Sequence, residues 1–197
     1  MNQIAAERVL GNLVMALEML ESSREFARIM PEVRVNLVYA LPEARTPAEV
    51  AGIDGRITAV RGFPAAAGLP RWGVSGHVAR LLLEARNYDA NLSAGINFKC
   101  DDEIIEVVQT YCAESGWLFG SVDRSAEPAD VAEVDGSSAP WKVSEVVAKF
   151  GGVPRLFYEG PGWGKEPLFY ALGGTATEVA AIAIEIAQRY HLKTEIE

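Results

Sequence analysis

One histidine of this chain stands where its chemistry could be used. His77 ends the glycine-rich segment Trp72-Gly-Val-Ser-Gly-His77, at the expected first turn of a helix. Backbone N–H groups converge at such a turn, so anions bind there readily. That field favours a neutral imidazole, which can still donate a hydrogen bond to a phosphate oxygen. A histidine packed there for structural reasons fits the spacing equally well.

A second set of candidate anion ligands comprises Arg56 and the loop Gly160-Pro-Gly-Trp-Gly-Lys165. The arginine fork can hold a phosphate in two places, although a lone arginine is more often a solvated surface group. The loop is not a Walker A motif, because Glu159 replaces its first glycine and Glu166 replaces its Ser/Thr. A glycine-rich turn with a lysine can hold phosphate through backbone donors, or it is a flexible hairpin loop.

Other chemistries are restricted by residue counts. Asp123 and Arg124 end an expected strand, where sites on α/β folds gather, and form either a ligand pair or a simple ion pair. The 2 histidines are too few for a three-histidine metal site, and no nucleophile elbow is present. Cys100 and Cys112 are too few and too far apart for a zinc or redox motif, and we interpret them as reduced thiols of a cytoplasmic protein.

Composition predicts one globular domain. The chain has 197 residues, of which 49% are hydrophobic, enough to bury a substantial core. It lacks an apolar run of about 20 residues and a secretory signal pattern, so no membrane span is expected. The net charge of −9 argues against binding to nucleic acid or to an anionic membrane. A phosphorylated small ligand remains compatible, because screening makes the local charges decisive.

The hydrophobic pattern predicts helices interleaved with six or seven strands. Some of these strands are joined by tight turns and others by helices, which indicates a mixed sheet covered on both faces. Helices are expected at 4–20, 77–88 (capped by Ser75), from 101, at 141–150 and from 175 to about 191. The first has a buried stripe of Leu10, Leu13, Leu17 and Leu20, with Val14 beside it. Strands are expected at 33–41, where alternation indicates a half-buried strand, and at 56–60, 63–67, 94–99, 117–123, 154–159 and 167–172.

Over nearly its full length the chain resembles the ThiN family of thiamine-phosphate synthase domains. Several sequence blocks in one order carry the resemblance, which makes it more specific than any single motif. They are 31–42, 46–57, Gly76-His-Val-Ala-Arg80, Ala94-Gly-Ile-Asn-Phe-Lys99, Asp102-Glu-Ile-Ile105, 119–128, Pro140-Trp141 and Gly164-Lys-Glu-Pro167.

The resemblance implies a fold and a reaction. The fold would be a three-layer α/β/α domain over 1–197, with a mixed, largely antiparallel sheet similar to that of class II aldolases. The reaction joins hydroxymethylpyrimidine diphosphate to hydroxyethylthiazole phosphate and releases diphosphate. Family members are usually fused to a pyrimidine kinase or a DNA-binding domain. Neither is recognised in this sequence, so the expected activity is that of the synthase domain alone, a stand-alone transferase.

The resemblance also implies roles for residues. By block, an arginine and a histidine important in the family correspond to Arg56, which would neutralise phosphate or leaving-group charge, and His77, which would bind phosphate or transfer a proton. Mg²⁺ is expected with the diphosphate substrate. The other substrate- or phosphate-binding candidates are Asn36, Ser75, Gly76, Asn97, Asp123, Arg124, Gly162, Gly164, Lys165 and Glu166.

Two departures from the family pattern keep an alternative open. Gly76 stands where many relatives have a serine, and Glu159 stands where Asp is expected. A non-catalytic sensor or carrier of thiamine phosphate is therefore the alternative function. An aldolase-like lyase is disfavoured by the histidine count. The sequence does not define the oligomer, and a homodimer is a reasonable expectation.

Overall fold

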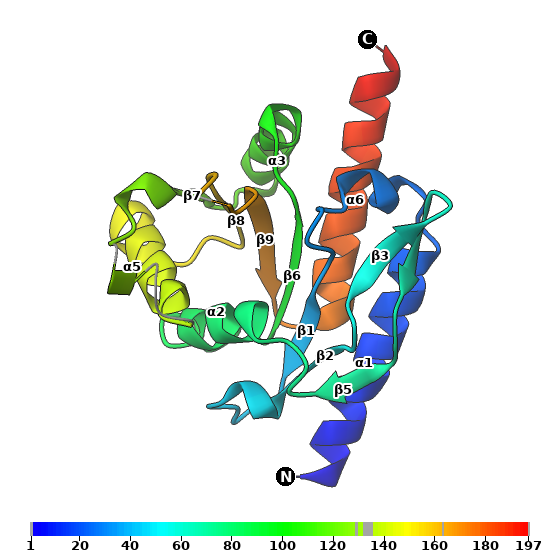
Figure 1. Ribbon diagram of the computed structural model, residues 1–197, viewed down its shortest axis with the longest axis vertical. Coiled ribbons are helices and arrows are strands. Elements are labelled where there is room, and N and C mark those ends of the chain that lie inside the picture. The colour runs from blue at the N-terminus through cyan, green and yellow to red at the C-terminus, as the bar shows by residue number, and fades with distance from the viewer. Residues whose placement is uncertain (1, 129, 132–135, 163, 197) are drawn as a thin grey trace.

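A seven-stranded sheet forms the centre of the molecule (Figure 1). The computed structural model describes residues 2–128, 130–131, 136–162 and 164–196. The strand order is β5-β2-β1-β6-β9-β8-β7, and every neighbouring pair is antiparallel except β7 and β8. The strands are β1 (Leu37–Ala40), β2 (Val50–Ile53), β5 (Pro70–Trp72), β6 (Ala94–Lys99), β7 (Phe119–Val122), β8 (Leu156–Glu159) and β9 (Leu168–Gly173).

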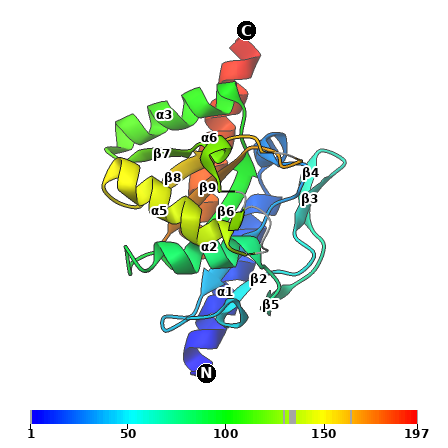
Figure 2. The same ribbon diagram turned by 60° about the vertical axis from the view of Figure 1, so that its left-hand side comes forward.

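Helices cover both faces of this sheet, which confirms the predicted mixed, largely antiparallel α/β arrangement (Figures 1 and 2). One face carries α1 (Gln3–Glu21) and α6 (Ala176–Ile196), with α3 (Asp102–Ser115) against α6. The other face carries α2 (His77–Ala85) and α5 (Ser138–Phe150). Short 3-10 turns are η1 (Glu25–Ile29), η2 (Pro47–Glu49) and η3 (Arg124–Ala126). None of the described helices has the length and apolar character needed to cross a membrane.

The middle strands are buried because helices lie on both sides of them. All six residues of β9 are buried, and so are five of the six residues of β6. Helix α1 is capped by Asn2 and buries most of the leucine stripe that its sequence predicts: Leu13 and Leu20 are fully inaccessible, whereas Leu10 is partly buried. Val14, expected beside that stripe, is instead 41% exposed, because it lies on the solvent side of the helix.

Three expectations from the sequence need correction. The strand expected at 33–41 is confined to β1 and is buried on both sides, so the alternation of a half-buried strand is absent. Strands β2 and β5 were not expected, since their glycine and proline content is typical of loops. Ser75 does not cap α2: Gly76 occupies the cap position, and the Ser75 hydroxyl lies 3.4 Å from Oδ1 of Asn36.

The predicted hairpin is present as β3 (Ile57–Val60) and β4 (Phe63–Ala66). Its base requires an unusual backbone, because Gly55 and Arg56 both have left-handed φ angles, of 69° and 70°. A non-glycine residue held in this region is strained and marks a position that its surroundings fix. A bridge between Val35 and Ile57 ties the hairpin base to the segment before β1. Arg56 is thereby held at one end of the sheet.

Replacing Gly55 by alanine should destabilise the protein more than replacing Gly62, the glycine of the hairpin turn. Both glycines have positive φ, but a Cβ at position 55 would lie 2.8 Å from the Cβ of Ala67, whereas nothing lies within 4 Å at position 62. We expect losses of about 2–3 kcal/mol for Gly55→Ala and about 1 kcal/mol for Gly62→Ala. Urea unfolding measures both, and equal losses would refute the contact with Ala67.

Candidate functional site

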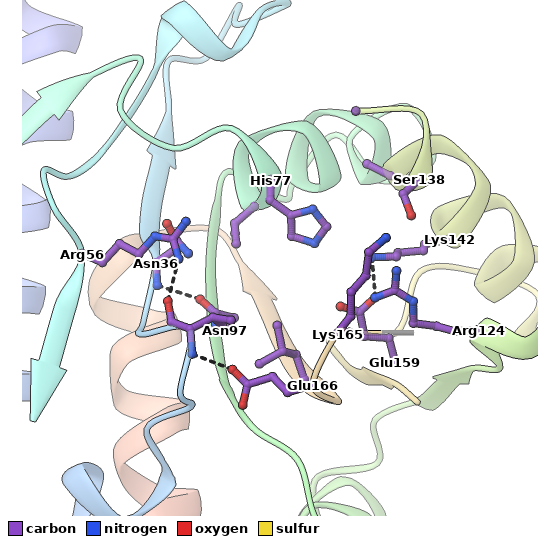
Figure 3. Close-up of a pocket in the computed structure, with 16 residues that line it drawn as sticks. Asn36, Arg56, His77, Asn97, Arg124, Ser138, Lys142, Glu159, Lys165 and Glu166 are labelled. Carbon is purple, nitrogen blue, oxygen red and sulfur yellow. Dashed lines mark hydrogen bonds and ion pairs between the residues drawn. The ribbon is translucent and has the colours of Figure 1, made fainter. Parts of the chain in front are cut away.

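A cavity of about 470 Å³ lies where the sheet meets the first turns of α2 and α5 and the base of the β3–β4 hairpin (Figure 3). Arg56, Asn36 and Asn97 lie on one side of it, and Lys142, Arg124 and Glu159 on the other, with His77 on the rim formed by α2. The cavity size is typical of a small-molecule site. Separate stretches of chain therefore contribute to one pocket.

Eight of the residues singled out from the sequence line this cavity. They are Asn36, Arg56, His77, Asn97, Arg124, Gly164, Lys165 and Glu166. The remaining lining residues are Val33, Val78, Gly136, Ser138, Ala139, Lys142, Glu159 and Leu168.

Four candidates do not line the cavity. Ser75 is 5% exposed and directed to Asn36. Gly76 lies against the Arg80 guanidinium, where a Cβ would be 3.4 Å from Nη1. Asp123 is exposed and caps η3 by accepting a hydrogen bond from the N–H of Ser125. Gly162 packs over Arg124, where a Cβ would lie 3.2 Å from Nε. These four residues instead contact side chains or elements next to the cavity: Asn36, Arg80, η3 and Arg124.

Two backbone donors of the glycine loop bond within the loop itself. The N–H groups of Gly162 and Lys165 bond to each other's carbonyl oxygens, at 3.1 and 3.0 Å. Both donors are therefore used within the turn. What the loop contributes to the cavity is the exposed Lys165 side chain, with Gly164 beside it.

The Arg56 side of the pocket is fixed by contacts to the segment before β1. Arg56 Nη1 donates to the carbonyl oxygen of Val33 at 2.6 Å. Glu166 accepts hydrogen bonds from the N–H groups of Val33 and Glu32, at 2.6 and 3.1 Å. Asn97, 1% exposed, accepts from the N–H of Asn36. Glu166 and Asn97 thus hold the backbone here. Among the described residues the carbonyl of Val33 is the only hydrogen-bond partner of the Arg56 guanidinium, which leaves its other donors to a ligand.

A buried ionic cluster forms the opposite side. Glu159, 2% exposed, forms an ion pair through Oε2 with Lys142 Nζ and lies 3.3 Å from Nη1 of Arg124. Arg124 also pairs with Glu127 at 3.1 Å. Breaking such a buried pair by removing one partner typically costs about 3–5 kcal/mol. The cluster therefore keeps two cations in place beside the cavity.

Lys142 and Glu159 are the site residues that sequence reasoning missed. Lys142 is 1% exposed, on the same face of α5 as Ala139, Val143 and Val146. A lysine within an apolar helical stripe is rarely buried without a partner, and this was the available signal. In the sequence, Glu159 is distinguished only by standing where the family pattern has Asp. Its partners lie on η3 and α5, which no local pattern could have connected to it.

Glu159 is also the end of a hydrogen-bonded chain that reaches His77. Nε2 of His77 lies 2.8 Å from the Tyr170 hydroxyl, which donates to Oε1 of Glu159 at 2.6 Å. Burial is the main cause that lowers the pKa of His77 to about 4, and the positive charges of Lys142, Arg124 and Arg80 act in the same direction, opposed by Glu159. His77 is therefore neutral at pH 7. Burial also raises the pKa of Tyr170 well above its usual value.

The charges around the cavity favour an anion despite the acidic protein. Its lining holds four basic side chains, Arg56, Arg124, Lys142 and Lys165, against the two carboxylates Glu159 and Glu166. The whole chain carries −9. Helix α2 begins at this cavity without a side-chain cap, so its first N–H groups add to the positive potential.

The described residues offer little to hold a metal ion directly. They contain no group of three or more histidine, cysteine, aspartate or glutamate side chains suited to a metal. Within the cavity, Glu159 is neutralised by cations and Glu166 accepts backbone N–H groups. The two cysteines are buried, and burial raises their pKa values to about 12 for Cys100 and about 11 for Cys112, so neither supplies a thiolate at neutral pH.

Acid should destabilise the protein partly through His77. Its pKa is about 4 in the folded chain, against an ordinary value of 6.5. Between these values the unfolded chain binds more protons, so stability rises with pH through this window and is lost as pH falls from 6.5 towards 4. The contribution is at most about 3 kcal/mol. Urea unfolding at both ends of the window should show a smaller loss in His77→Gln; identical losses would contradict a depressed pKa.

Comparisons with known proteins agree with one another. A family model described as thiamine-phosphate synthase ThiN matches residues 12–185. The thiamine-phosphate synthase ThiN of Methanothermobacter thermautotrophicus is 36% identical over 179 residues, which cover 91% of this chain and 92% of that protein. The bifunctional thiamine biosynthesis protein ThiDN of Methanocaldococcus jannaschii is 32% identical over 190 residues, 95% of this chain but 42% of that protein.

A solved structure is similar in fold. The crystal structure of the C-terminal domain of a phosphomethylpyrimidine kinase superposes with a TM-score of 0.86 at 30% sequence identity. The match covers 92% of this chain and 99% of that domain.

Proposed function

Because this chain belongs to the thiamine-phosphate synthase ThiN family, we propose that its cavity is the active site of that reaction. The protein is a transferase that condenses hydroxymethylpyrimidine diphosphate with hydroxyethylthiazole phosphate, giving thiamine phosphate and diphosphate. The observation that supports this location is the gathering of Arg56, His77, Lys142 and Lys165 around one cavity.

The distribution of charge suggests how the substrates are placed. Lys142, Arg124 and Lys165 surround the side that suits the diphosphate, which carries the larger negative charge. Arg56, on the opposite side, would hold the thiazole phosphate through its free guanidinium donors. Two phosphorylated ends anchored on opposite walls would bring the two rings together between them.

The reaction places two demands on such a pocket. The thiazole nitrogen must lie in line with the methylene carbon, and negative charge must be neutralised as the carbon–oxygen bond breaks and diphosphate takes the bonding electrons. Fixed cations in a partly buried site meet the second demand without reorganising. The buried pairs of Glu159 keep Lys142 and Arg124 in position for it.

We propose that Mg²⁺ enters as part of the diphosphate substrate. Mg²⁺ is commonly bound through substrate phosphates and few protein ligands. This suits a pocket whose two carboxylates already have partners. The ion would share with Lys142 and Lys165 the charge of the departing diphosphate.

We also infer the wider context. One continuous core includes residues from Val9 to Ala187, which supports a single domain. The mixed sheet with helices on both faces is consistent with a class II aldolase-like architecture. Two buried free cysteines fit a reducing, cytoplasmic environment. The substrates are small molecules, with nucleic acid and membrane disfavoured by the net charge of −9. A homodimer is compatible with this function.

Arg56→Ala and Lys142→Met should each lower kcat/KM for thiamine phosphate formation by about 100-fold or more, because each removes a cation that neutralises phosphate charge. Arg71→Ala is the matched control, since this arginine has an exposed side chain paired with Asp54 away from the cavity. The assay uses both phosphorylated precursors, Mg²⁺ and chromatographic detection of the product. Wild-type protein that binds thiamine phosphate tightly without forming it would instead indicate a sensor or carrier.

Chelating Mg²⁺ should abolish turnover while leaving the fold unchanged. The described carboxylates of the cavity have other partners, so the free protein does not depend on the ion. We therefore expect the same thermal unfolding midpoint with and without EDTA in the absence of substrate. Activity should return on adding Mg²⁺ in excess of the chelator. A midpoint that falls with EDTA alone would show a resident metal ion and contradict this proposal.

A further inference from the structure

The hydrogen-bonded chain from Glu159 to His77 has a direction. Glu159 lies between Lys142 and Arg124 and is thus held as a carboxylate, which only accepts hydrogen bonds. The Tyr170 hydroxyl has one proton, and it must be donated to Glu159 Oε1, 2.6 Å away. The Tyr170 oxygen can then only accept from His77. The ring nitrogen that faces it at 2.8 Å, Nε2, must carry the proton.

The other ring nitrogen is left with a lone pair. A neutral imidazole protonated on Nε2 has an unprotonated Nδ1, which accepts a hydrogen bond and cannot donate one. Within the part of the chain that the structure describes, no protein group bonds to Nδ1, and His77 lines the cavity. An unprotonated Nδ1 is unsuited to binding a phosphate oxygen, because its lone pair would face the negative charge of that oxygen. This arrangement favours an acceptor role for His77 over the phosphate-donor role expected from the sequence.

The groups around the imidazole keep it neutral. Lys142 on α5, Arg124 on η3 and Arg80 on α2 bring positive charge towards it, and Glu159 on β8 brings negative charge. Tyr170 on β9 forms the hydrogen bond. Burial of the ring is the main cause that disfavours a positive charge on it, and the nearby cations Lys142 and Arg124 act in the same direction.

We propose that Tyr170 and Glu159 are positioning residues that fix the Nε2–H form of His77, so that Nδ1 accepts a hydrogen bond from the exocyclic amino group of the pyrimidine substrate. This rests on the proposed function. Of the two substrates, hydroxyethylthiazole phosphate has no N–H group, whereas the aminopyrimidine has one. The contact strengthens as the carbon–oxygen bond breaks, because the electron-poor ring makes its amino group a better donor. His77 thereby selects and orients the pyrimidine.

The protonation state of His77 can be observed without substrate. The chain has only 2 histidines, so ¹⁵N-histidine labelling of the His191→Gln protein leaves one imidazole in the NMR spectrum. At pH 7.5 we expect a protonated Nε2 and an unprotonated Nδ1. Tyr170→Phe should populate both neutral forms. The control Tyr158→Phe, which removes a hydroxyl outside the cavity lining, should leave the spectrum unchanged. A charged ring, or a proton on Nδ1 in the His191→Gln protein, would overturn the proposal.

Binding of the pyrimidine diphosphate alone, with Mg²⁺, tests the ligand. Calorimetry should show about tenfold weaker binding to His77→Ala than to wild type, the usual effect of one lost hydrogen bond. The analogue in which hydrogen replaces the amino group should bind both proteins equally. His77→Asn, which retains an acceptor oxygen near the place of Nδ1, should lose less than His77→Ala.

These measurements distinguish a failure of the proposed amino contact from a failure of the proposed synthase function. Equal weakening of the substrate and its analogue by His77→Ala would assign the histidine to phosphate or to the fold, and would overturn the amino contact. Failure of wild-type protein to bind either pyrimidine diphosphate would overturn the proposed function itself. A pH-independent ratio of the two affinities in wild type between pH 6 and 8 is expected, because the ring stays neutral across that range; a ratio that falls on acidification there would contradict it.

Discussion

The carboxylate of Glu159, buried between Lys142 and Arg124, is the interaction on which the rest of the site depends. It compensates Lys142 and, together with Glu127, Arg124, two cations that are buried beside the sheet. It also fixes the hydroxyl of Tyr170, and through it the ring of His77. One charge therefore positions both the anion-binding side of the cavity and the neutral imidazole. Its strand, β8, lies within the sheet between β9 and β7, which gives the carboxylate a rigid base.

The same arrangement explains how an acidic protein binds phosphorylated substrates. A net charge of −9 acts over the whole surface and is screened within about 8 Å at physiological salt. Inside the cavity the basic side chains outnumber the carboxylates, and the nearby end of α2 adds uncapped N–H groups. Keeping His77 neutral has a separate consequence in our proposal, since it provides an acceptor close to the cationic groups. Such a pocket can distinguish an amino group from a phosphate.

Much of the fold follows from local patterns. The stripe of α1, the hairpin turn at Arg61-Gly62 and the strands β6, β8 and β9 were predictable, because apolar periodicity and turn residues act over a few neighbours. Strands β2 and β5 were not, since the pairing of β2 with β1 and of β5 with β2 overrides the low strand preference of glycine and proline. Residue type and spacing singled out His77, Arg56 and Lys165 as candidate anion ligands, the family resemblance added roles for Arg56 and His77, and the structure places all three around one cavity.

The sequence by itself determined the class of protein: an α/β domain with too few histidines for a metal triad, and the blocks of a thiamine-phosphate synthase family. Only the tertiary structure decided how the residues act. It showed Glu166 and Asn97 holding backbone, and Lys142 facing the cavity from a buried helix face. It also gave the imidazole its hydrogen-bonding direction. These properties depend on contacts between residues far apart in the chain, such as His77 and Tyr170, and no local pattern encodes a partner 93 residues away.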